Sequence, residues 1–413
     1  MPSRSVFEQV LRYNAGRDPE RLARKLIAMR RHPFAFFRGT AHLFYADQQL
    51  LQPLGDAPPI WSCGDLHLEN FGCYKGDNRL AYFDLNDFDD AALGPLTWDL
   101  VRLLTSLRLG LRAEAGNPRL LSEFLLGEYA AILEGGKPRW IERATAEGAV
   151  LELLRRAKLR RRRALLTERT EWSPERNRHR LRLLPERTLA ASAAEHRQVG
   201  AVIARLRLPG VEPRFFRVLD VARRVAGIAS LGLTRYVVLV EGRGSPSNNY
   251  LLDVKGAIPS TLAESSPSKQ PHWRDEAERI VVVQQWMQAV SPALLTATRL
   301  GGTACVVREL QPTADRLTLA AWRSRPRGME RLLRTVAQVT AWDHLRAAGR
   351  RGAASADELM RFGKQRGWKA AVLRVAERAA VQVEANWQSF VAALPAESKT
   401  RSRKRTSNRK AER

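Results

Sequence analysis

The residues with the clearest potential for chemistry lie between Ile60 and Asp99, where carboxylates gather in a chain whose net charge is +26. Its carboxylates and amides include Asp65, Glu69, Asn70, Asp84, Asn86, Asp87, Asp89 and Asp90. Aromatic residues alternate with them, which is unusual for the carboxylates of a solvated turn. The pattern therefore favours a functional site over its main alternative, an acidic surface loop.

The spacing inside this stretch indicates phosphoryl transfer. Asp65 is followed five positions later by Asn70, the D-x-x-x-x-N spacing of a kinase catalytic loop, in which the Asp accepts the proton of the attacking hydroxyl. Asp84 then follows at the end of a predicted strand. Mg²⁺ prefers carboxylate and amide oxygens, so we predict Asp65, Asn70 and Asp84 as catalytic residues and Asn70, Asp84 and Asp87 as metal ligands.

The elements around these residues are expected to aim them at one point. A turn composition over residues 75–78 precedes the apolar run 80–83, which predicts a hairpin and a short buried strand. Residues 98–111 have the periodicity of an amphipathic helix. Four further residues are expected to support the site, namely Arg38, His67, Asp89 and Asp99.

A second segment, beginning near residue 217, has the pattern of an antiparallel meander. Two β-like runs, 236–240 and 250–254, are separated by turn residues. The preceding turn is rich in glycine and resembles a loop that covers phosphates, and Lys255 ends the third predicted strand, where a kinase places its phosphate-binding lysine. The nucleotide-binding residues predicted here are Gly227, Ser230, Gly232, Lys255 and Glu309, the last at a hinge that would contact adenine. Glu276 or Glu278, on the next helix, is a candidate partner for Lys255.

These parts occur in the reverse of the usual kinase order, because the glycine-rich loop follows the catalytic loop by more than 150 residues. We therefore expect an α+β fold with two lobes, protein-kinase-like and circularly permuted, with a small antiparallel sheet lobe and a larger helical lobe. The expected organisation is a helical lobe (1–210) with the catalytic loop (60–99) and a basic excursion (155–190), a β-rich nucleotide lobe (215–312), helices that complete the helical lobe (313–395), and a disordered basic tail (396–413).

The motifs HPFAFFRGTA, WSCGDLHLENFG, FDLNDFDDAALGPLTWDLVRL, RVAGIASLGLTRYVVLVEG, LLDVKGA, VVVQQWMQ and VVREL resemble the uncharacterised bacterial DUF2252 family. This resemblance spans about residues 20–390, and the family is similar in turn to the protein-kinase-like fold of aminoglycoside phosphotransferases and choline kinases. It implies Asp65 as the base, Asn70 and Asp84 as metal ligands, and Lys255 as the phosphate lysine. Ala229 stands where the pattern expects a middle glycine.

The leading functional hypothesis is an ATP- and Mg²⁺-dependent phosphotransferase that acts on a small hydroxylated molecule. Two alternatives stay open. One is a non-catalytic pseudokinase or a nucleotide-sensing or nucleic-acid-associated scaffold. The other is a metal-dependent phosphohydrolase, which would need further His and Asn ligands, whereas six of the seven histidines lack the required neighbours. The arginine-rich block 155–163 and the tail 399–413 would give weak, non-specific nucleic-acid binding.

From composition, we expect a cytoplasmic protein. No run of about 18 apolar residues occurs, so no membrane span is expected. The N-terminal residues lack the apolar core of a signal peptide. Cys63, Cys73 and Cys305 have neither the number nor the spacing of a disulfide framework or a zinc site.

Overall fold

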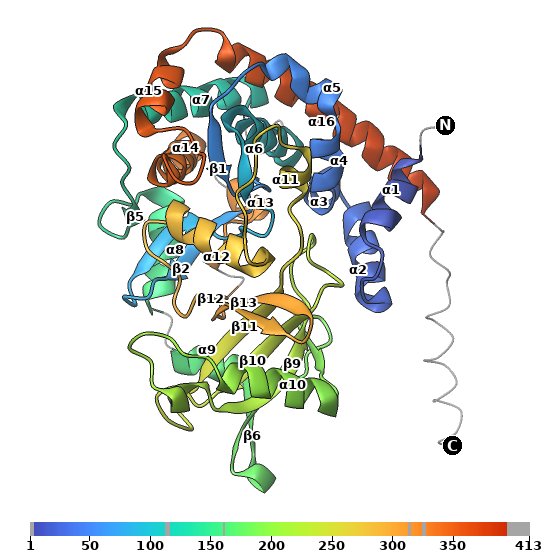
Figure 1. Cartoon of the computed structure of the whole chain (residues 1–413), viewed down its shortest axis with the longest axis vertical. Helices are drawn as coiled ribbons and strands as arrows, with labels where there is room; N and C mark the ends of the chain where they lie inside the picture. Colours follow the sequence, from blue (N-terminus) through green and yellow to red (C-terminus); the bar gives the residue numbers. More distant parts are fainter. Residues whose placement is uncertain (1–3, 112–115, 160–161, 313–314, 324–327, 395–413) are drawn as a thin grey trace.

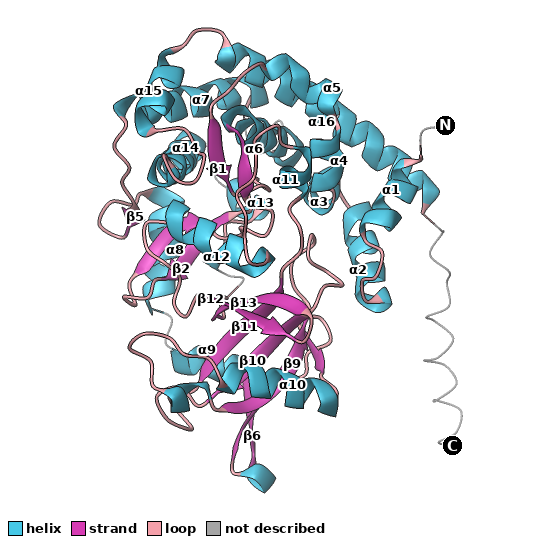
Figure 2. Ribbon diagram, in the orientation of Figure 1, coloured by secondary structure: helices cyan, strands magenta, loops and turns pink. Residues whose placement is uncertain are grey.

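The computed structural model describes residues 4–111, 116–159, 162–312, 315–323 and 328–394. Helices fill one part of the molecule, and an antiparallel sheet lies at the opposite end (Figures 1 and 2). The predicted α+β class with antiparallel sheets is confirmed. The predicted disordered tail, 396–413, lies outside the described residues.

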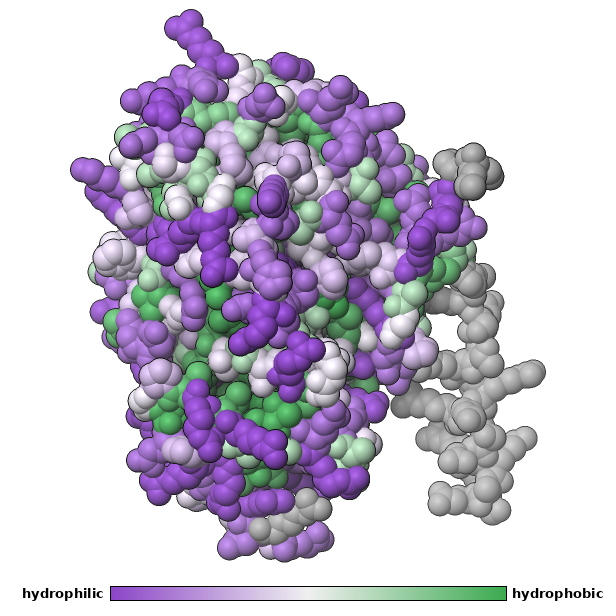
Figure 3. All heavy atoms as spheres, in the orientation of Figure 1, coloured by the Kyte–Doolittle hydropathy of each residue, from purple (hydrophilic) through white to green (hydrophobic). Residues whose placement is uncertain are grey.

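Hydrophilic side chains cover most of the face shown in Figure 3, as expected of a chain with 69 Lys and Arg residues. None of the described helices combines the length and the apolar character that crossing a membrane requires.

The large sheet has six strands in the order β12–β13–β11–β10–β9–β8. Their bounds are β8 (Thr188–Ala190), β9 (Val218–Arg224), β10 (Arg235–Val240), β11 (Tyr250–Gly256), β12 (Thr296–Leu300) and β13 (Thr303–Glu309). Neighbouring strands are antiparallel, and the register places Arg235 of β10 opposite Lys255 of β11. The β-branched and aromatic residues of β10 suit such a doubly buried strand.

The two faces of this sheet have different covers. Val238 and Leu252 face one side and pack with α10 (Ala193–Ala204). Val237 and Leu251 face the other, because side chains alternate along a strand, and there Leu166 packs on them. The second cover consists of α9 (Arg162–Arg169) and the hairpin β6 (Thr170–Ser173) and β7 (Arg178–Leu181).

The predicted lobe boundary near residue 210 is therefore wrong. Strand β8 and helix α10 precede that boundary, yet they belong to the large sheet and its cover. The basic excursion 155–190 likewise contributes α9 and β7 to the opposite face. Composition marked this segment as irregular because it is rich in Arg and Pro, whereas its few leucines decide where it packs.

The main hydrophobic core lies among the helices. Its longest members are α6 (Leu96–Gly110), α7 (Pro118–Gly135), α14 (Met329–Ala347) and α16 (Trp368–Ala393). Every residue of α6 except Arg108 is buried, because helices and strands pack around it on several sides. The helix predicted over 98–111 is thus present, but it is buried all round and does not expose a polar face.

The remaining helices surround this core or connect it to the sheet. They are α1 (Val6–Tyr13), α2 (Pro19–Arg30), α3 (Pro33–Gly39), α4 (Ala41–Ala46), α5 (Gln48–Leu51), α8 (Gly148–Leu159), α11 (Thr261–Ser265), α12 (Glu276–Met287), α13 (Leu319–Arg323) and α15 (Ala356–Lys364).

Two small ladders frame the carboxylate-rich stretch. They are formed by β1 (Pro59–Ser62) with β4 (Ala92–Pro95), and by β2 (Phe71–Lys75) with β3 (Ala81–Leu85), which also pairs with β5 (Ile141–Glu142). Ser62 pairs with Ala92, and Phe71 pairs with Leu85. Both ends of loop 63–70 are therefore tied to both ends of loop 86–91, which holds the two loops side by side.

Candidate active site

Loop 63–70 approaches loop 86–91 so closely that a side chain is excluded between them. Gly64 has φ +81°, and a Cβ at this position would lie 1.9 Å from the backbone oxygen of Asp90. Only glycine meets both conditions, since it tolerates positive φ and needs no space for a Cβ. The G in WSCGD is thus explained by contact between the two loops.

Asp65, the predicted base, lies in this loop with its carboxylate 18% exposed. Arg102 Nη2 donates to Asp65 Oδ1 at 2.5 Å, and the Arg102 side chain is fully buried. Burial raises the pKa of Asp65, while the charge of Arg102 opposes that rise. Phe37 packs against the Arg102 guanidinium, with its ring centroid 4.1 Å from Cζ, so the aromatic segment before the loop supports the Asp65 partner.

Asn70 joins the two loops through its side-chain amide. Its Oδ1 accepts from the backbone N–H of Asp87 at 2.8 Å, and its Nδ2 donates to the backbone oxygen of Asp87 at 3.1 Å. The same Nδ2 is 3.3 Å from the backbone oxygen of Asp65. The D-x-x-x-x-N spacing therefore positions Asp87 beside Asp65. With these bonds in place, Asn70 acts as a brace for the loop and offers its oxygen to the backbone.

Lys255 comes from the large sheet and meets the second loop. Its Nζ lies 3.3 Å from Asp87 Oδ1 and forms an ion pair with Asp89. Burial works to raise the pKa of Asp87, but the charges of Lys255, Arg316 and Arg308 outweigh it and hold this pKa well below its usual value. Asp87 is therefore a carboxylate under the conditions of any physiological reaction.

The predicted pairing of Lys255 with a glutamate of α12 is not observed. Glu276 forms an ion pair with Arg279 at 2.6 Å, and Glu278 accepts from the backbone N–H of Arg274. Arg279 also donates to the backbone oxygen of Asp89 at 2.9 Å. Helix α12 thus supports the carboxylate loop through its arginine, and the carboxylates of that loop neutralise Lys255.

A cavity of about 50 Å³ brings residues of the two segments together. Its walls include Lys25, Arg38, Asp65, Asp87, Asp89, Asp90 and Ser230. The four carboxylates come from the paired loops, Ser230 from the loop after β9, and Lys25 from α2. Segments that lie more than 150 residues apart in the sequence therefore form one polar site.

Asp84 does not belong to this site, contrary to the geometry predicted from the sequence. Its carboxylate lies on β3, where it is 3% exposed, and Arg346 Nη2 donates to it at 3.3 Å. Asp343 of α14 shares the same arginine. Asp84 precedes the end of β3, whereas Asp87 lies beyond that end in the loop that Asn70 holds. The residue that follows the strand is thus the one in the cavity.

The glycine-rich loop is present between β9 and β10 and has the expected backbone freedom. Gly227 and Gly232 have φ of +76° and +90°. Ser230 is 5% exposed, and Arg235 Nη1 donates to its Oγ at 3.3 Å. Helices α1 and α2 hold this loop, since Lys25 Nζ donates to the backbone oxygen of Ala229. The structure therefore uses the backbone oxygen of Ala229, which alanine supplies as well as the glycine expected at this position.

Of the remaining predicted residues, Arg38 and His67 lie beside Asp65. Arg38 Nε donates to His67 Nε2 at 3.1 Å, and that nitrogen is 4.0 Å from Asp65 Oδ2. Burial lowers the pKa of His67 well below its usual value, so the ring is neutral. Arg38 also forms an ion pair with Glu69.

Asp99 and Glu309 lie outside the cavity. Asp99 is buried in α6, where it accepts from Ser62 Oγ, and Ser62 Oγ accepts from the backbone N–H of Gly64 at 2.9 Å. Asp99 therefore braces the first loop, in keeping with the supporting role expected for it. Glu309 forms an ion pair with Arg79 and lines a different cavity, so the structure does not bring it together with Lys255.

The sheet face beside Lys255 is only partly open. Asp253, two residues before Lys255 on the same face, forms ion pairs with Arg224 at 2.5 Å and Arg235 at 2.6 Å. Further along this face, Leu166 and Leu181 cover the apolar residues of β9, β10 and β11. The part of this face next to Lys255 is therefore polar and held by ion pairs, and the apolar part is covered by the 162–181 segment.

Sequence reasoning missed two buried cations, Arg102, which pairs with Asp65, and Lys25, which lines the same cavity. Arg102 lies in the helix predicted over residues 98–111, where that prediction depended on the apolar residues alone. Lys25 is fully buried, and burial lowers its pKa well below the usual value. Arg21, Lys25 and Met29 recur every four residues on the buried face of α2, and this periodic placement of cations is a signal that the sequence does contain.

The described residues include no group of three or more His, Cys, Asp or Glu side chains arranged to hold a metal ion. Mg²⁺, however, is usually held by one or two carboxylates together with substrate phosphates. Asp87 and Asp89 are two hard oxygen donors at one cavity, with Asp65 beside them. This donor set fits Mg²⁺ that arrives with a phosphate ligand.

The fold and site define an α+β protein with a polar cavity between a helical core and an antiparallel sheet. The chain belongs to the family described as "Uncharacterized protein conserved in bacteria (DUF2252)", which matches residues 17–393. Comparisons with curated proteins and with solved structures gave no match.

Proposed function

We propose that this protein is an ATP- and Mg²⁺-dependent phosphotransferase whose acceptor is a small hydroxylated molecule. One observation carries the proposal: the ammonium of Lys255 lies 3.3 Å from Asp87, which is 168 residues away in the chain, and Asp87 lines the same polar cavity as Asp65. A phosphate-binding cation, two carboxylates for a metal and a further carboxylate for the acceptor are the parts that phosphoryl transfer requires.

Each side chain has a distinct role in this proposal. Asp65 orients the acceptor hydroxyl and accepts its proton, and its raised pKa suits a group that must bind a proton during the reaction. Asp87 and Asp89 would hold Mg²⁺, which when bound neutralises charge on the phosphates. Lys255 would exchange its ion pairs with these carboxylates for contact with the phosphates.

The order of elements along the sheet supports a protein-kinase-like lobe. Strand β9, the glycine-rich loop, strand β10, strand β11 with Lys255, and helix α12 follow one another in the order in which kinases use a glycine-rich loop, a lysine on the third strand and a helix. Because the loop with Asp65 precedes all of them, we propose that the chain is a circular permutation of that fold.

The proposal places the phosphates of ATP in the polar cavity and does not place the adenine base there. Leu166 and Leu181 cover the apolar sheet face on which the adenine base of ATP would otherwise pack. Binding of ATP therefore requires that α9 and β7 move, or that the base lies outside this face. The cavity of about 50 Å³ is also too small for a triphosphate, so the phosphates must displace the present ion pairs.

A non-catalytic, nucleotide-sensing role is the second candidate, and one observation favours it. The fully buried Arg102 side chain forms an ion pair with Asp65 Oδ1. This contact reduces the capacity of Asp65 to act as a base. The phosphohydrolase alternative has no comparable support, since the described residues hold no cluster of three or more metal-ligating side chains.

The test compares three carboxylates of one segment. Asp87→Asn should abolish the Mg²⁺-dependent stabilisation by ATP in a thermal-shift assay and any ATP turnover, because it removes one of the two donors. Asp77→Asn, at an exposed position in the preceding turn, should match the wild type. Folded Asp84→Asn should retain the ATP response. An unchanged ATP response in Asp87→Asn would eliminate the proposed site, and stabilisation by ATP without turnover would favour the sensing role.

A further inference from the structure

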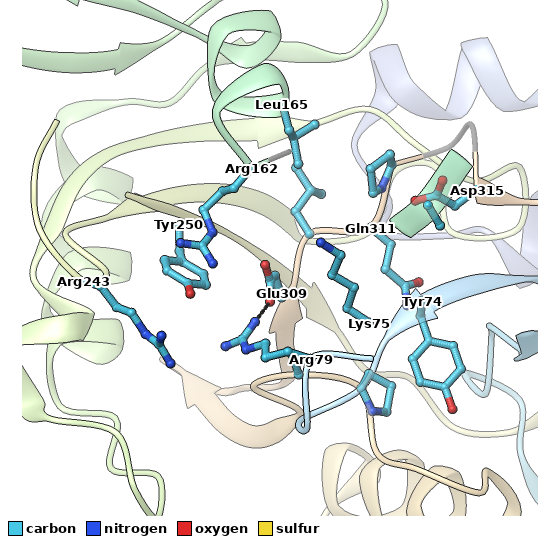
Figure 4. Close-up of a pocket in the computed structure, with 15 residues that line it drawn as sticks. Tyr74, Lys75, Arg79, Arg162, Leu165, Arg243, Tyr250, Glu309, Gln311 and Asp315 are labelled. Atoms are coloured by element: carbon cyan, nitrogen blue, oxygen red, sulfur yellow. Dashed lines mark hydrogen bonds and ion pairs between the residues drawn. The ribbon is translucent and has the colours of Figure 1, made fainter. Parts of the chain in front are cut away.

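A second cavity, larger than the first, lies where the β2–β3 hairpin meets α9 and the ends of β11 and β13 (Figure 4). Its volume is about 170 Å³, and it shares no lining residue with the Asp65 cavity. Its polar walls include Lys75, Arg79, Arg162, Arg243, Tyr250 and Gln311.

The charge at this cavity is unbalanced. Arg79 is paired with Glu309, but Lys75, Arg162 and Arg243 form no ion pair with any residue that the structure describes. Lys75 and Arg162 are only partly exposed. The lining also includes the Asp315 carboxylate, so four cations face two carboxylates, Glu309 and Asp315. The excess cations repel one another, and partial burial increases that cost. An anion bound between them would remove it.

Tyr250 lies at the centre of this group of cations. Arg162 Cζ is 3.8 Å and Arg79 Cζ is 5.3 Å from the centroid of its ring, and Figure 4 shows Arg243 on the remaining side. The Tyr250 hydroxyl is buried without a hydrogen-bond partner among the described residues, and so is Gln311 Oε1. Unsatisfied buried polar atoms are uncommon in native proteins, so this wall lacks part of its hydrogen bonding.

The apolar part of the lining includes Leu165, Pro292 and Pro312. A cavity of roughly 150 Å³ is large enough to hold benzene, so the present one accommodates a ligand body of ring size. The ligand must therefore combine an anionic group, which meets the cations, with a compact apolar part, which meets these walls.

We propose that this cavity binds a small phosphate monoester with an apolar body the size of one ring. The excess of two positive charges in the lining matches a dianion better than a monoanion, and guanidinium groups bind phosphate oxygens in a bidentate manner. The site is separate from the proposed phosphotransfer site, and the proposal does not depend on that function.

Calorimetric titration with phenyl phosphate tests this inference. Wild type should bind phenyl phosphate more tightly than benzoate, and benzyl alcohol should not bind. Arg162→Gln and Arg243→Gln should each weaken binding of phenyl phosphate about tenfold or more, because each removes a charge-assisted contact. Arg214→Gln, at a side chain 81% exposed, is the matched control and should bind as the wild type does.

Two outcomes of these titrations would overturn the inference, and a third concerns Asp87→Asn. One is equal binding of benzyl alcohol and phenyl phosphate, which would show that the cations play no part. The other is unchanged affinity in Arg243→Gln, whose exposed side chain can be replaced without disturbing the core. Asp87→Asn separates the two proposals, since it should retain phenyl phosphate binding even if it loses the response to ATP. Loss of phenyl phosphate binding in folded Asp87→Asn would place the ligand in the first cavity and contradict the inference.

Discussion

The pair formed by Asp65 and Arg102 determines the character of the candidate site at the level of single residues. Arg102 is fully buried and its nearest carboxylate oxygen is 2.5 Å away, while burial raises the pKa of Asp65. The pair therefore holds a carboxylate in a defined orientation at the edge of the cavity. The same pairing makes each partner costly to remove, because the other remains charged in a poorly solvated place.

Replacing Arg102 by Met should lower the free energy of unfolding by about 3–5 kcal/mol, the range for breaking a buried ion pair. Arg108→Met, on the same helix, is the control. Arg108 faces the half-exposed Glu377 at 3.4 Å, so this variant should lose about 1 kcal/mol or less. Urea denaturation followed by circular dichroism measures both. Equal losses in the two variants would show that the Asp65–Arg102 pair has no special energetic role.

At the scale of elements, the site depends on two loops that four short strands hold together. Ser62 pairs with Ala92 and Phe71 pairs with Leu85, so neither loop can shift without the other. Gly64 then allows their backbones to touch, and Asn70 connects them through its amide. This arrangement places Asp65 and Asp87 on adjacent loops and leaves Asp84 in the strand.

Gly64→Ala should therefore destabilise the protein by roughly 2 kcal/mol or more, since the new methyl group overlaps Asp90 and alanine is strained at positive φ. Gly127→Ala is the matched control, because Gly127 lies in helix α7 with no atom within 4 Å of the added Cβ. It should stabilise the protein by about 0.5–1 kcal/mol. Thermal unfolding distinguishes the two, and a neutral Gly64→Ala would contradict the close approach of the loops.

At the scale of the whole molecule, contacts between distant segments join the sheet to the helical core. Lys255 meets Asp87, and Asp90 accepts from both the backbone N–H and the hydroxyl of Thr261 at the start of α11. Burial raises the pKa of Asp90 to about 6, against the hydrogen bonds of Thr261, which lower it. The connection between the two parts is thus sensitive to protonation.

The sign of this dependence follows from the raised pKa. The folded protein binds the Asp90 proton more tightly than the unfolded chain does, so the stabilisation is complete below about pH 4 and is lost as the pH rises through about 6. We expect the Asp90 contribution to the free energy of unfolding to fall by roughly 1–3 kcal/mol across that range.

Asp90→Asn, which keeps an acceptor for Thr261 but does not titrate, supplies the comparison. The stability difference between the variant and the wild type, measured by denaturant unfolding at pH 4 and pH 6.5, should shift in favour of the variant at the higher pH. A difference that stays constant with pH would rule out the titration of Asp90.

Local chemistry allowed much of the site to be predicted from the sequence. The turn at 75–78, the strand after it, the helix at Trp98 and a strand ending at Lys255 depend on short-range periodicity and turn residues, and all are present. Asp65 and Asn70, which the D-x-x-x-x-N spacing predicts as a base and a metal ligand, both lie beside the second carboxylate loop. These features depend on residues close together in the chain.

Only the tertiary structure decided which charged residues form ion pairs with one another. Asp84 pairs with Arg346, 262 residues away, and Asp87 with Lys255, 168 residues away, and nothing local distinguishes these two aspartates except which of them lies beyond the end of β3. The sequence likewise did not predict that Leu166 and Leu181 cover one face of the large sheet. The sequence determined where carboxylates and cations stand along the chain, and packing determined which of them meet, because ion pairs act through space and not along the backbone.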